Sequence, residues 1–256
     1  MSTTRIQGSL FTNIQQKVAT IEFGHPASNS FPSELLARLT NELNSLSKNN
    51  EVAVIILKSE GEKTFCAGAS FDELIAIKNL EEGKQFFSGF ANVINAMRTC
   101  GKIIIGRVQG KAVGGGLGLA AACDYVLATE FASIKLSEFT IGIGPFVIAP
   151  AIERKMGIAV LSELTLDATS WKNAYWAKEK GLYAQVFETT KELDIELELL
   201  ALKLASYNPE ALATMKKILW ENTQHWDDLL IQRASITGEL VMSEFTKNAL
   251  ANFSTK

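Results

Sequence analysis

"KAVGGGLGLAAACD", residues Lys111 to Asp124, sets three consecutive glycines directly before an almost wholly apolar, helix-forming run. Glycines are best explained where the backbone needs a positive φ angle or where another group approaches it closely. A strand-like segment, "KIIIGRVQG" (Lys102 to Gly110), precedes the triplet, so we expect its amides at a helix N-terminus, where partial positive charge collects. Such amides can hold an oxyanion, but a glycine-rich turn that packs a helix tightly on a sheet would need the same residues.

Composition sets the class of the protein. The chain has 256 residues, 47% of them hydrophobic, which is enough for one large domain or a domain with an appendage. A net charge of −3 without a basic run argues against a nucleic-acid partner. No apolar stretch is long enough to span a bilayer, and the first thirteen residues lack the apolar core of a signal peptide. We therefore expect a cytoplasmic globular protein without nucleic-acid or membrane partners.

Cysteine and histidine are scarce. Cys66, Cys100 and Cys123 lie in apolar contexts without metal-ligand spacing, so they are interpreted as small core residues of a reducing compartment. His25 and His225 are isolated from the cysteines and from each other. We therefore expect no metal site, and with only two histidines a Ser-His-Asp triad is not favoured.

The order of predicted elements indicates an α/β layer structure. Helical patterns alternate with runs rich in β-branched residues, which predict strands at 17–23, 51–59, 102–108, 125–129 and 132–138. From about Lys191 the pattern is helical only, with segments at 191–207, 209–222 and 226–252. No low-complexity linker separates the two parts, so we expect the helical tail to pack on its own core or on a neighbouring subunit.

Two further segments carry candidate chemistry. "TFCAGASFDEL" (Thr64 to Leu74) puts a small-residue turn after a strand and could offer a second free amide. "KLSEFTIGIGPFVIAP" (Lys135 to Pro150) places Glu138 at a strand end, before an apolar loop with glycine and proline. Desolvation there would raise the pKa of Glu138 and suit it to moving protons, although a lone glutamate is more often a surface residue. Ser70 and Asp72 could instead cap a helix, and Asp124 could accept from turn amides.

In this order, "FCAGAS", "GKAVGGGLGLAAACDY" and "SEFTIGIGP" resemble the two oxyanion turns and the catalytic-acid segment of the enoyl-CoA hydratase/isomerase family, the crotonase superfamily. The resemblance runs from about Lys17 to Asn222. It implies an α/β fold of repeated ββα units coiled into a superhelix over residues 1–195. It also implies a helical region at 196–256 used in self-association as a trimer or a dimer of trimers.

The resemblance also implies a substrate and its contacts. An acyl-CoA thioester would place its oxygen between the N–H groups of Ala69 and Gly115, with Glu138 as the catalytic residue. Two aimed amides would stabilise the enolate. No metal, nicotinamide or flavin cofactor is then expected, since the thioester is the electron sink and coenzyme A belongs to the substrate. The remaining expected substrate-binding residues are Ala67, Gly68, Ser70, Phe71, Gly114, Gly118 and Phe146.

The chain departs from the family pattern at two places. Two-glutamate hydratases carry a second carboxylate two residues after the triplet, where this chain has Gly118. Relatives with only the later glutamate include Δ3,Δ2-enoyl-CoA isomerases and hydratases that resemble 3-methylglutaconyl-CoA hydratase, and "SEFTIGIGPFVIAPAIERKMG" looks most like the latter. A CoA-contacting lysine is replaced by Asp72, and Lys216 is one candidate for a phosphate contact, although a solvated helix lysine is the more common case.

Parts of the sequence are compatible with two other classes of function. A dinucleotide-binding oxidoreductase would need G-x-G-x-x-G, but after Gly114 and Gly116 the third position falls on Leu119, so the spacing refutes it. A non-catalytic acyl-CoA-binding protein stays open, and only Glu138 argues against it.

Overall fold

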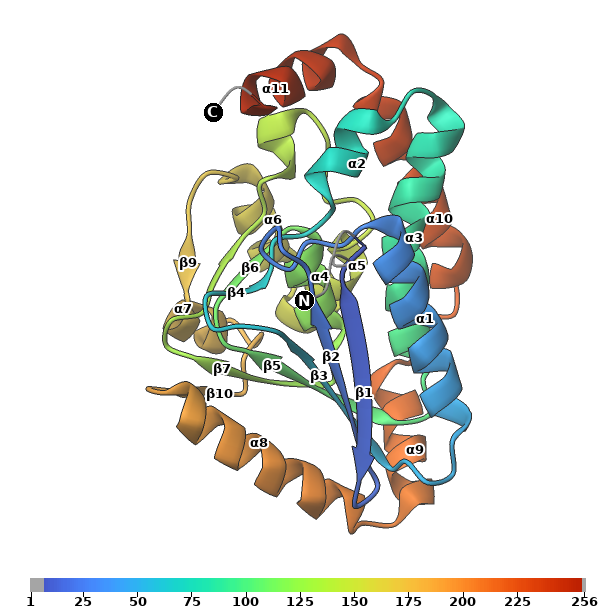
Figure 1. Ribbon diagram of the computed structural model, residues 1–256, viewed down its shortest axis with the longest axis vertical. Coiled ribbons are helices and arrows are strands. Elements are labelled where there is room, and N and C mark those ends of the chain that lie inside the picture. The colour runs from blue at the N-terminus through green and yellow to red at the C-terminus, as the bar shows by residue number, and fades with distance from the viewer. Residues whose placement is uncertain (1–6, 255–256) are drawn as a thin grey trace, which may run out of the picture.

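Two β-sheets organise the protein in the computed structural model, which describes residues 7–254 (Figure 1). Six strands form the larger sheet in the order β1-β2-β3-β5-β7-β10, and four form the smaller one in the order β4-β6-β8-β9. All pairs are parallel except β1–β2 and β8–β9. The strands are β1 (Ser9–Gln15), β2 (Val18–Gly24), β3 (Val54–Ser59), β4 (Thr64–Cys66), β5 (Ile103–Val108), β6 (Lys111–Val113), β7 (Tyr125–Thr129), β8 (Ser133–Lys135), β9 (Lys172–Asn173) and β10 (Gln185–Phe187).

The chain divides its strands between the sheets in a repeating way. β3, β5 and β7 join the larger sheet, and the strand after each of them, β4, β6 and β8, joins the smaller one. Because β4, β6 and β8 run parallel, their carboxyl ends lie along one edge of the smaller sheet. That edge brings together the three segments that the sequence singles out. The ββα architecture expected from the sequence is confirmed.

Helices cover both faces of the larger sheet (Figure 1). The helices of residues 7–254 are α1 (Ser33–Lys48), α2 (Phe71–Ala76), α3 (Leu80–Thr99), α4 (Gly115–Ala122), α5 (Ala149–Met156), α6 (Ile158–Leu166), α7 (Ala174–Glu179), α8 (Thr190–Ala205), α9 (Pro209–Leu219), α10 (Trp226–Val241), α11 (Glu244–Ser254) and a 3-10 turn η1 (Glu138–Ile141). In α1 the buried residues are leucines at helical spacing, which is why this segment forms a helix against the core.

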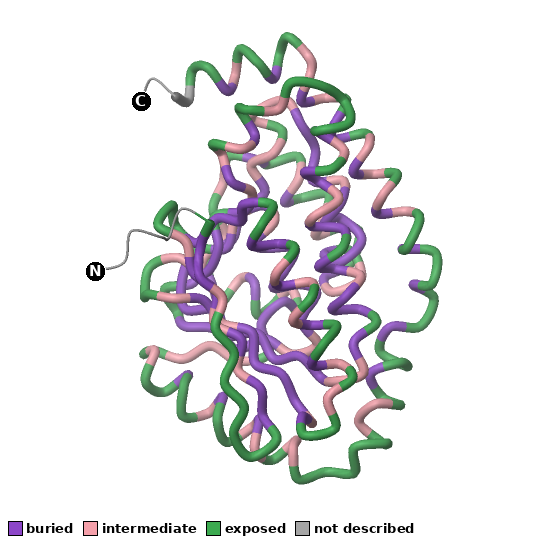
Figure 2. Tube along the Cα trace, turned by 45° about the vertical axis from the view of Figure 1, so that its right-hand side comes forward, coloured by how far each residue is buried: buried purple, intermediate pink, exposed green. Residues whose placement is uncertain are grey.

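Alternation along the central strands separates two hydrophobic cores. In β3, Ile55 and Leu57 belong to the main core, which includes the buried faces of α1, α3, α4 and α10. Val54 and Ile56 face the other way and pack with Leu193 and its neighbours on α8. Successive strand residues point to opposite faces, so a buried parallel strand is apolar on both sides. Figure 2 shows the buried residues concentrated between these layers.

The helical C-terminal part is confirmed from Thr190 onward. The expected boundary at residue 195 falls inside α8, whose apolar face completes the second core. The long run expected from Trp226 is two helices, α10 and α11, separated at Met242 and Ser243. Within residues 7–254, no helix combines the length and apolarity needed to cross a bilayer.

Strand β1 was not expected. It is an edge strand whose residues after Leu10 are exposed, including Phe11 and Ile14. Its sequence therefore lacks the alternation of apolar and polar residues that would predict a strand. The first six residues of the N-terminal segment lie outside the described range.

Candidate active site

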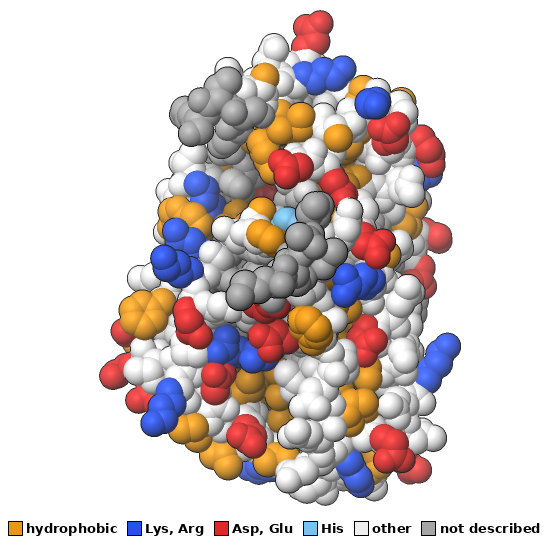
Figure 3. Space-filling model, in the orientation of Figure 1, with side chains coloured by type: hydrophobic (Ala, Val, Ile, Leu, Met, Phe, Trp, Pro, Cys, Tyr) orange, Lys and Arg blue, Asp and Glu red, His pale blue; other side chains and the backbone are white. Residues whose placement is uncertain are grey.

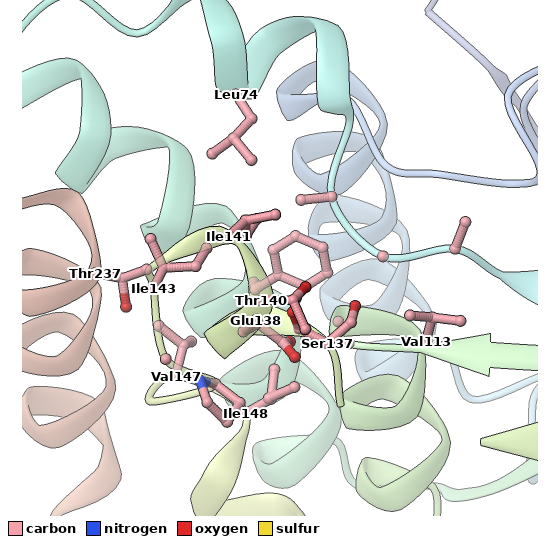
Figure 4. Close-up of a pocket in the computed structure, with 18 of the residues that line it drawn as sticks. Leu74, Val113, Ser137, Glu138, Thr140, Ile141, Ile143, Val147, Ile148 and Thr237 are labelled. Carbon is pink, nitrogen blue, oxygen red and sulfur yellow. The ribbon is translucent and has the colours of Figure 1, made fainter. Parts of the chain in front are cut away.

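A cavity of about 390 Å³ lies at the carboxyl edge of the smaller sheet (Figure 4). The turn after β4, the start of α4, η1 and the loop before α5 form most of its wall, and α3 and α10 contribute residues to it. Figure 4 shows Glu138 among Ser137, Thr140 and Ile148 in the middle of the lining side chains. The lining residues are Ala67, Gly68, Ala69, Phe71, Leu74, Phe87, Phe90, Val113, Gly114, Gly115, Lys135, Ser137, Glu138, Thr140, Ile141, Ile143, Gly144, Pro145, Val147, Ile148, Trp171 and Thr237.

Each glycine of the triplet makes room for a different neighbour. Gly114 has φ +53°, and a Cβ there would lie 2.7 Å from Oε1 of Glu138. A Cβ on Gly115 would lie 2.3 Å from the ring of Phe90, and one on Gly116 would lie 2.3 Å from the backbone oxygen of Cys66. The triplet thus seats a carboxyl, an aromatic ring and a neighbouring strand against one stretch of backbone. A larger residue at Gly115 would first displace Phe90, itself part of the cavity wall.

Two residues of the cavity wall, Ala69 and Gly115, have backbone amides that are unpaired in the described structure. The N–H groups of Gly68, Ser70 and Gly114 donate within the fold, to Cys66 Sγ, Phe31 O and Lys135 O. Those of Ala69 and Gly115 have no acceptor in the part of the chain that the structure describes. A Cβ on Gly68 would lie 3.3 Å from the Gly115 nitrogen, so the two turns are in contact. Gly115 also begins α4, where the helix leaves amides unpaired.

The carboxyl group of Glu138 is enclosed. The residue as a whole is half-buried, but Oε2 is buried and has no hydrogen-bond partner in the described structure. Burial raises the pKa of Glu138 to about 7, against the opposing effect of the backbone amides of Glu138 and Ser137. An acid with this pKa exchanges its proton readily near neutral pH. Within the cavity wall, Glu138 is the one carboxylic acid.

Three expected substrate-binding residues lie outside the described cavity wall. Ser70 is the N-cap of α2 and accepts from the amide of Glu73. Phe146 packs its ring on Gly144, which does line the cavity. Gly118 is buried in α4, and a Cβ there would lie 2.5 Å from Cγ2 of Ile148.

The contact at Gly118 bears on the second acid of two-glutamate relatives. Ile148 lines the cavity and fills the space next to Gly118. A glutamate at position 118 would therefore overlap Ile148. In this chain glycine stands at position 118, and the bulky apolar side chain of Ile148, from another segment, occupies the adjacent space.

The phosphate contact considered for Lys216 is wrong. Its ammonium is buried and lies 2.9 and 2.7 Å from the two carboxylate oxygens of Asp124. Trp220 Nε1 and the amide of Ile104 also donate to that carboxylate, and Lys155 donates to the backbone oxygens of Cys123 and Asp124. The cluster satisfies the C-terminal end of α4 at the far side from the cavity.

Much of the cavity wall has no signal in the local sequence. The aromatic residues of α3 and Thr237 of α10 reach it only through tertiary packing. Lys135 and Ser137 lie inside the quoted "KLSEFTIGIGP" segment, so their proximity to Glu138 was the one available signal. Nothing in the local sequence pointed to Trp171.

The three cysteines are buried core residues, as expected. Desolvation raises the pKa of Cys66 and of Cys123 to about 12, so both thiols stay protonated near neutral pH. Across the described residues, no group of three or more His, Cys, Asp or Glu side chains is placed to hold a metal ion.

Comparison with known proteins identifies the family. The family model for enoyl-CoA hydratase/isomerase matches residues 13–251, and the chain belongs to this family, the crotonase superfamily. It is 29% identical over 244 residues to "Probable enoyl-CoA hydratase" of Bacillus subtilis, covering 94% of this chain and 93% of that protein. It is 34% identical over 167 residues to mitochondrial methylglutaconyl-CoA hydratase of Rattus norvegicus, covering 65% of this chain and 52% of the relative.

A solved structure shows the same fold. The crystal structure of enoyl-CoA hydratase from Bacillus halodurans superposes with a TM-score of 0.88 at 20% identity, covering 95% of this chain and 99% of that one. The expected superhelix of ββα units and the C-terminal helical region are thus confirmed. The chain is an enzyme of the hydratase/isomerase family.

Proposed function

We propose that this enzyme acts on an enoyl-CoA thioester through an enolate held by the amides of Ala69 and Gly115, with Glu138 as its single acid–base group. The enclosed carboxyl of Glu138, with its pKa raised to about 7 and its Oε1 next to Gly114, carries the proposal. The apolar wall from α2, α3 and η1 would receive the acyl chain. Coenzyme A enters as part of the substrate, and no further cofactor is needed because the thioester accepts the electron pair.

Hydration would proceed in two steps. The Glu138 carboxylate takes a proton from water as the hydroxide oxygen bonds to Cβ, and the electron pair of the double bond moves through Cα to the thioester oxygen. The two amides stabilise this oxyanion, each contributing on the order of a hundredfold in rate. The protonated Glu138 then returns its proton to Cα, which restores the thioester and the carboxylate. Similarity to methylglutaconyl-CoA hydratase supports a branched or carboxylated acyl group.

A second candidate is the Δ3,Δ2 shift of a double bond. The contact between Gly118 and Ile148 favours it, because an apolar side chain occupies the place where a second carboxylate would help hold the attacking water. Isomerisation requires one base, which removes a proton from Cα or Cγ and returns it to the other carbon. A non-catalytic acyl-CoA-binding role is a third outcome, and a desolvated proton-exchanging group argues against it.

A substrate panel tests these alternatives. Hydration and isomerisation are assayed separately on straight-chain, branched and carboxylated enoyl-CoA thioesters, with Glu138→Gln and Glu221→Gln in parallel. Glu221 is an exposed acid in the turn after α9, outside the cavity wall, and serves as the matched control. We expect turnover of at least one substrate, lost by a factor of 100 or more in Glu138→Gln. Full turnover in Glu138→Gln contradicts the assignment, and no turnover of any thioester favours the binding protein.

We also propose self-association as a trimer or a dimer of trimers. Large apolar side chains on the C-terminal helices are exposed in the single chain, among them Ile218, Ile236 and Phe245. Covering them in an assembly would remove apolar surface from water. Light scattering at micromolar concentration tests this, and a monomeric mass contradicts it.

A further inference from the structure

The outer face of the smaller sheet carries two lysines beside the cavity. β6 and β8 pair in the register Ala112↔Ile134 and Val113↔Lys135. Ala112 and Ile134 are fully buried, so Lys111, Val113 and Lys135 lie on the opposite face. Val113 and Lys135 line the cavity, and the exposed Lys111 lies next to them. The cavity floor therefore continues into a cationic surface.

Trp171, just before β9, brings the two lysines together. The Lys111 ammonium lies 5.2 Å and the Lys135 ammonium 5.5 Å from the centre of its ring. Cation–π contact holds each, but two like charges beside one ring repel one another. Neither forms an ion pair in the described structure, whereas neighbouring Lys172 lies 2.7 Å from a Glu163 oxygen. Figure 3 shows basic side chains gathered on the left of the molecule, in the region where Figure 1 places β9.

Both lysines lie beside the ring of Trp171, and no carboxylate of residues 7–254 forms an ion pair with either of them. The lysines are thus uncompensated on a chain whose net charge is −3. An anion bound between the two ammonium groups would relieve their repulsion, and a substrate lying in the adjoining cavity could provide that anion.

We propose that Lys111, Lys135 and Trp171 form an anion subsite that binds a carboxylate or phosphate group of the acyl-CoA substrate. The inference rests on the proposed function, since it takes the thioester to lie in the cavity. The anion is either a carboxylate at the distal end of the acyl chain or a phosphate of coenzyme A. The remaining wall around Leu74, Phe87 and Ile141 is apolar and offers no comparable partner for a charge.

Binding of saturated thioesters, which cannot react, tests the subsite. The probes are glutaryl-CoA, pentanoyl-CoA and the pantetheine thioesters of the same two acids, measured by titration calorimetry. The proteins are the unmodified chain, Lys111→Gln, the double variant Lys111→Gln/Lys135→Gln, and Lys203→Gln. Lys203 is an exposed lysine of α8, on the other side of the larger sheet, and is the control.

We expect the double variant to weaken binding of the anion-bearing probe about tenfold, with Lys111→Gln intermediate and Lys203→Gln unchanged. If the acyl carboxylate is the ligand, both glutaryl probes weaken and both pentanoyl probes do not. If a phosphate is the ligand, both CoA thioesters weaken and both pantetheine thioesters do not. Unchanged binding of all four probes overturns the proposal, as does equal weakening of all four, including the neutral one.

Lys111→Gln changes only an exposed side chain, so it keeps the test decisive if the double variant fails to fold. None of these measurements requires turnover. A failure of the catalytic assignment to Glu138 would therefore appear in the activity assay and leave the binding result intact.

Discussion

Replacing Glu138 by glutamine should stabilise the protein at alkaline pH while abolishing turnover. The pKa of the buried carboxyl is about 7, against an ordinary value of 4.5. Between these values the folded state holds a proton that the unfolded state has released, so the free energy of unfolding falls as pH rises. One pKa unit corresponds to about 1.4 kcal/mol, so the total loss above pH 7 is roughly 3 kcal/mol. Glutamine does not ionise and does not suffer this loss.

Urea unfolding at equal protein concentration measures the effect. We expect the stability of Glu138→Gln relative to the unmodified protein to increase by roughly 2–3 kcal/mol from pH 5 to pH 8. Glu221→Gln, which changes an exposed acid, should show no such change. The same group should appear in kinetics as a fall in kcat/KM below about pH 7, because the base must be ionised. A stability difference independent of pH, with kcat/KM level down to pH 5, would refute the raised pKa.

Three further substitutions test how the site is built. Gly114→Ala should lower kcat about tenfold or more, because the added Cβ would press on the Glu138 carboxyl. Gly61→Ala is the control: Gly61 also has a positive φ but open space around its Cβ, so this variant shows the effect of backbone strain alone. Gly118→Glu should lower the melting temperature, because the new side chain overlaps Ile148. The double variant Gly118→Glu/Ile148→Ala should regain the melting temperature and should hydrate crotonyl-CoA faster than the unmodified enzyme. Lys216→Ala should lower the free energy of unfolding by about 3–5 kcal/mol, since it leaves a buried carboxylate without its cation; a loss under 1 kcal/mol would contradict this.

Local patterns in the sequence sufficed where a single element explains the residues. The leucines of α1 repeat at helical spacing, and the β-branched runs of β3, β5 and β7 mark buried strands. The edge strand β1 escaped because most of its side chains face solvent, so no hydrophobic pattern distinguishes it from a loop.

The sequence by itself determined the family and the parts of the site that are contiguous in the chain. The glycine triplet before a helix and the lone acid at a strand end can be recognised from the sequence. Unpaired amides follow from the helix N-terminus itself, and a carboxyl group is a property of one residue. Only the tertiary structure decided what surrounds them. Ile148 fills the space beside Gly118, and Lys216 pairs with Asp124 across 92 positions of sequence. Trp171 lies beside Lys111 and Lys135 in the same way. Such contacts depend on how separate elements pack, and no periodicity or spacing within one segment encodes them.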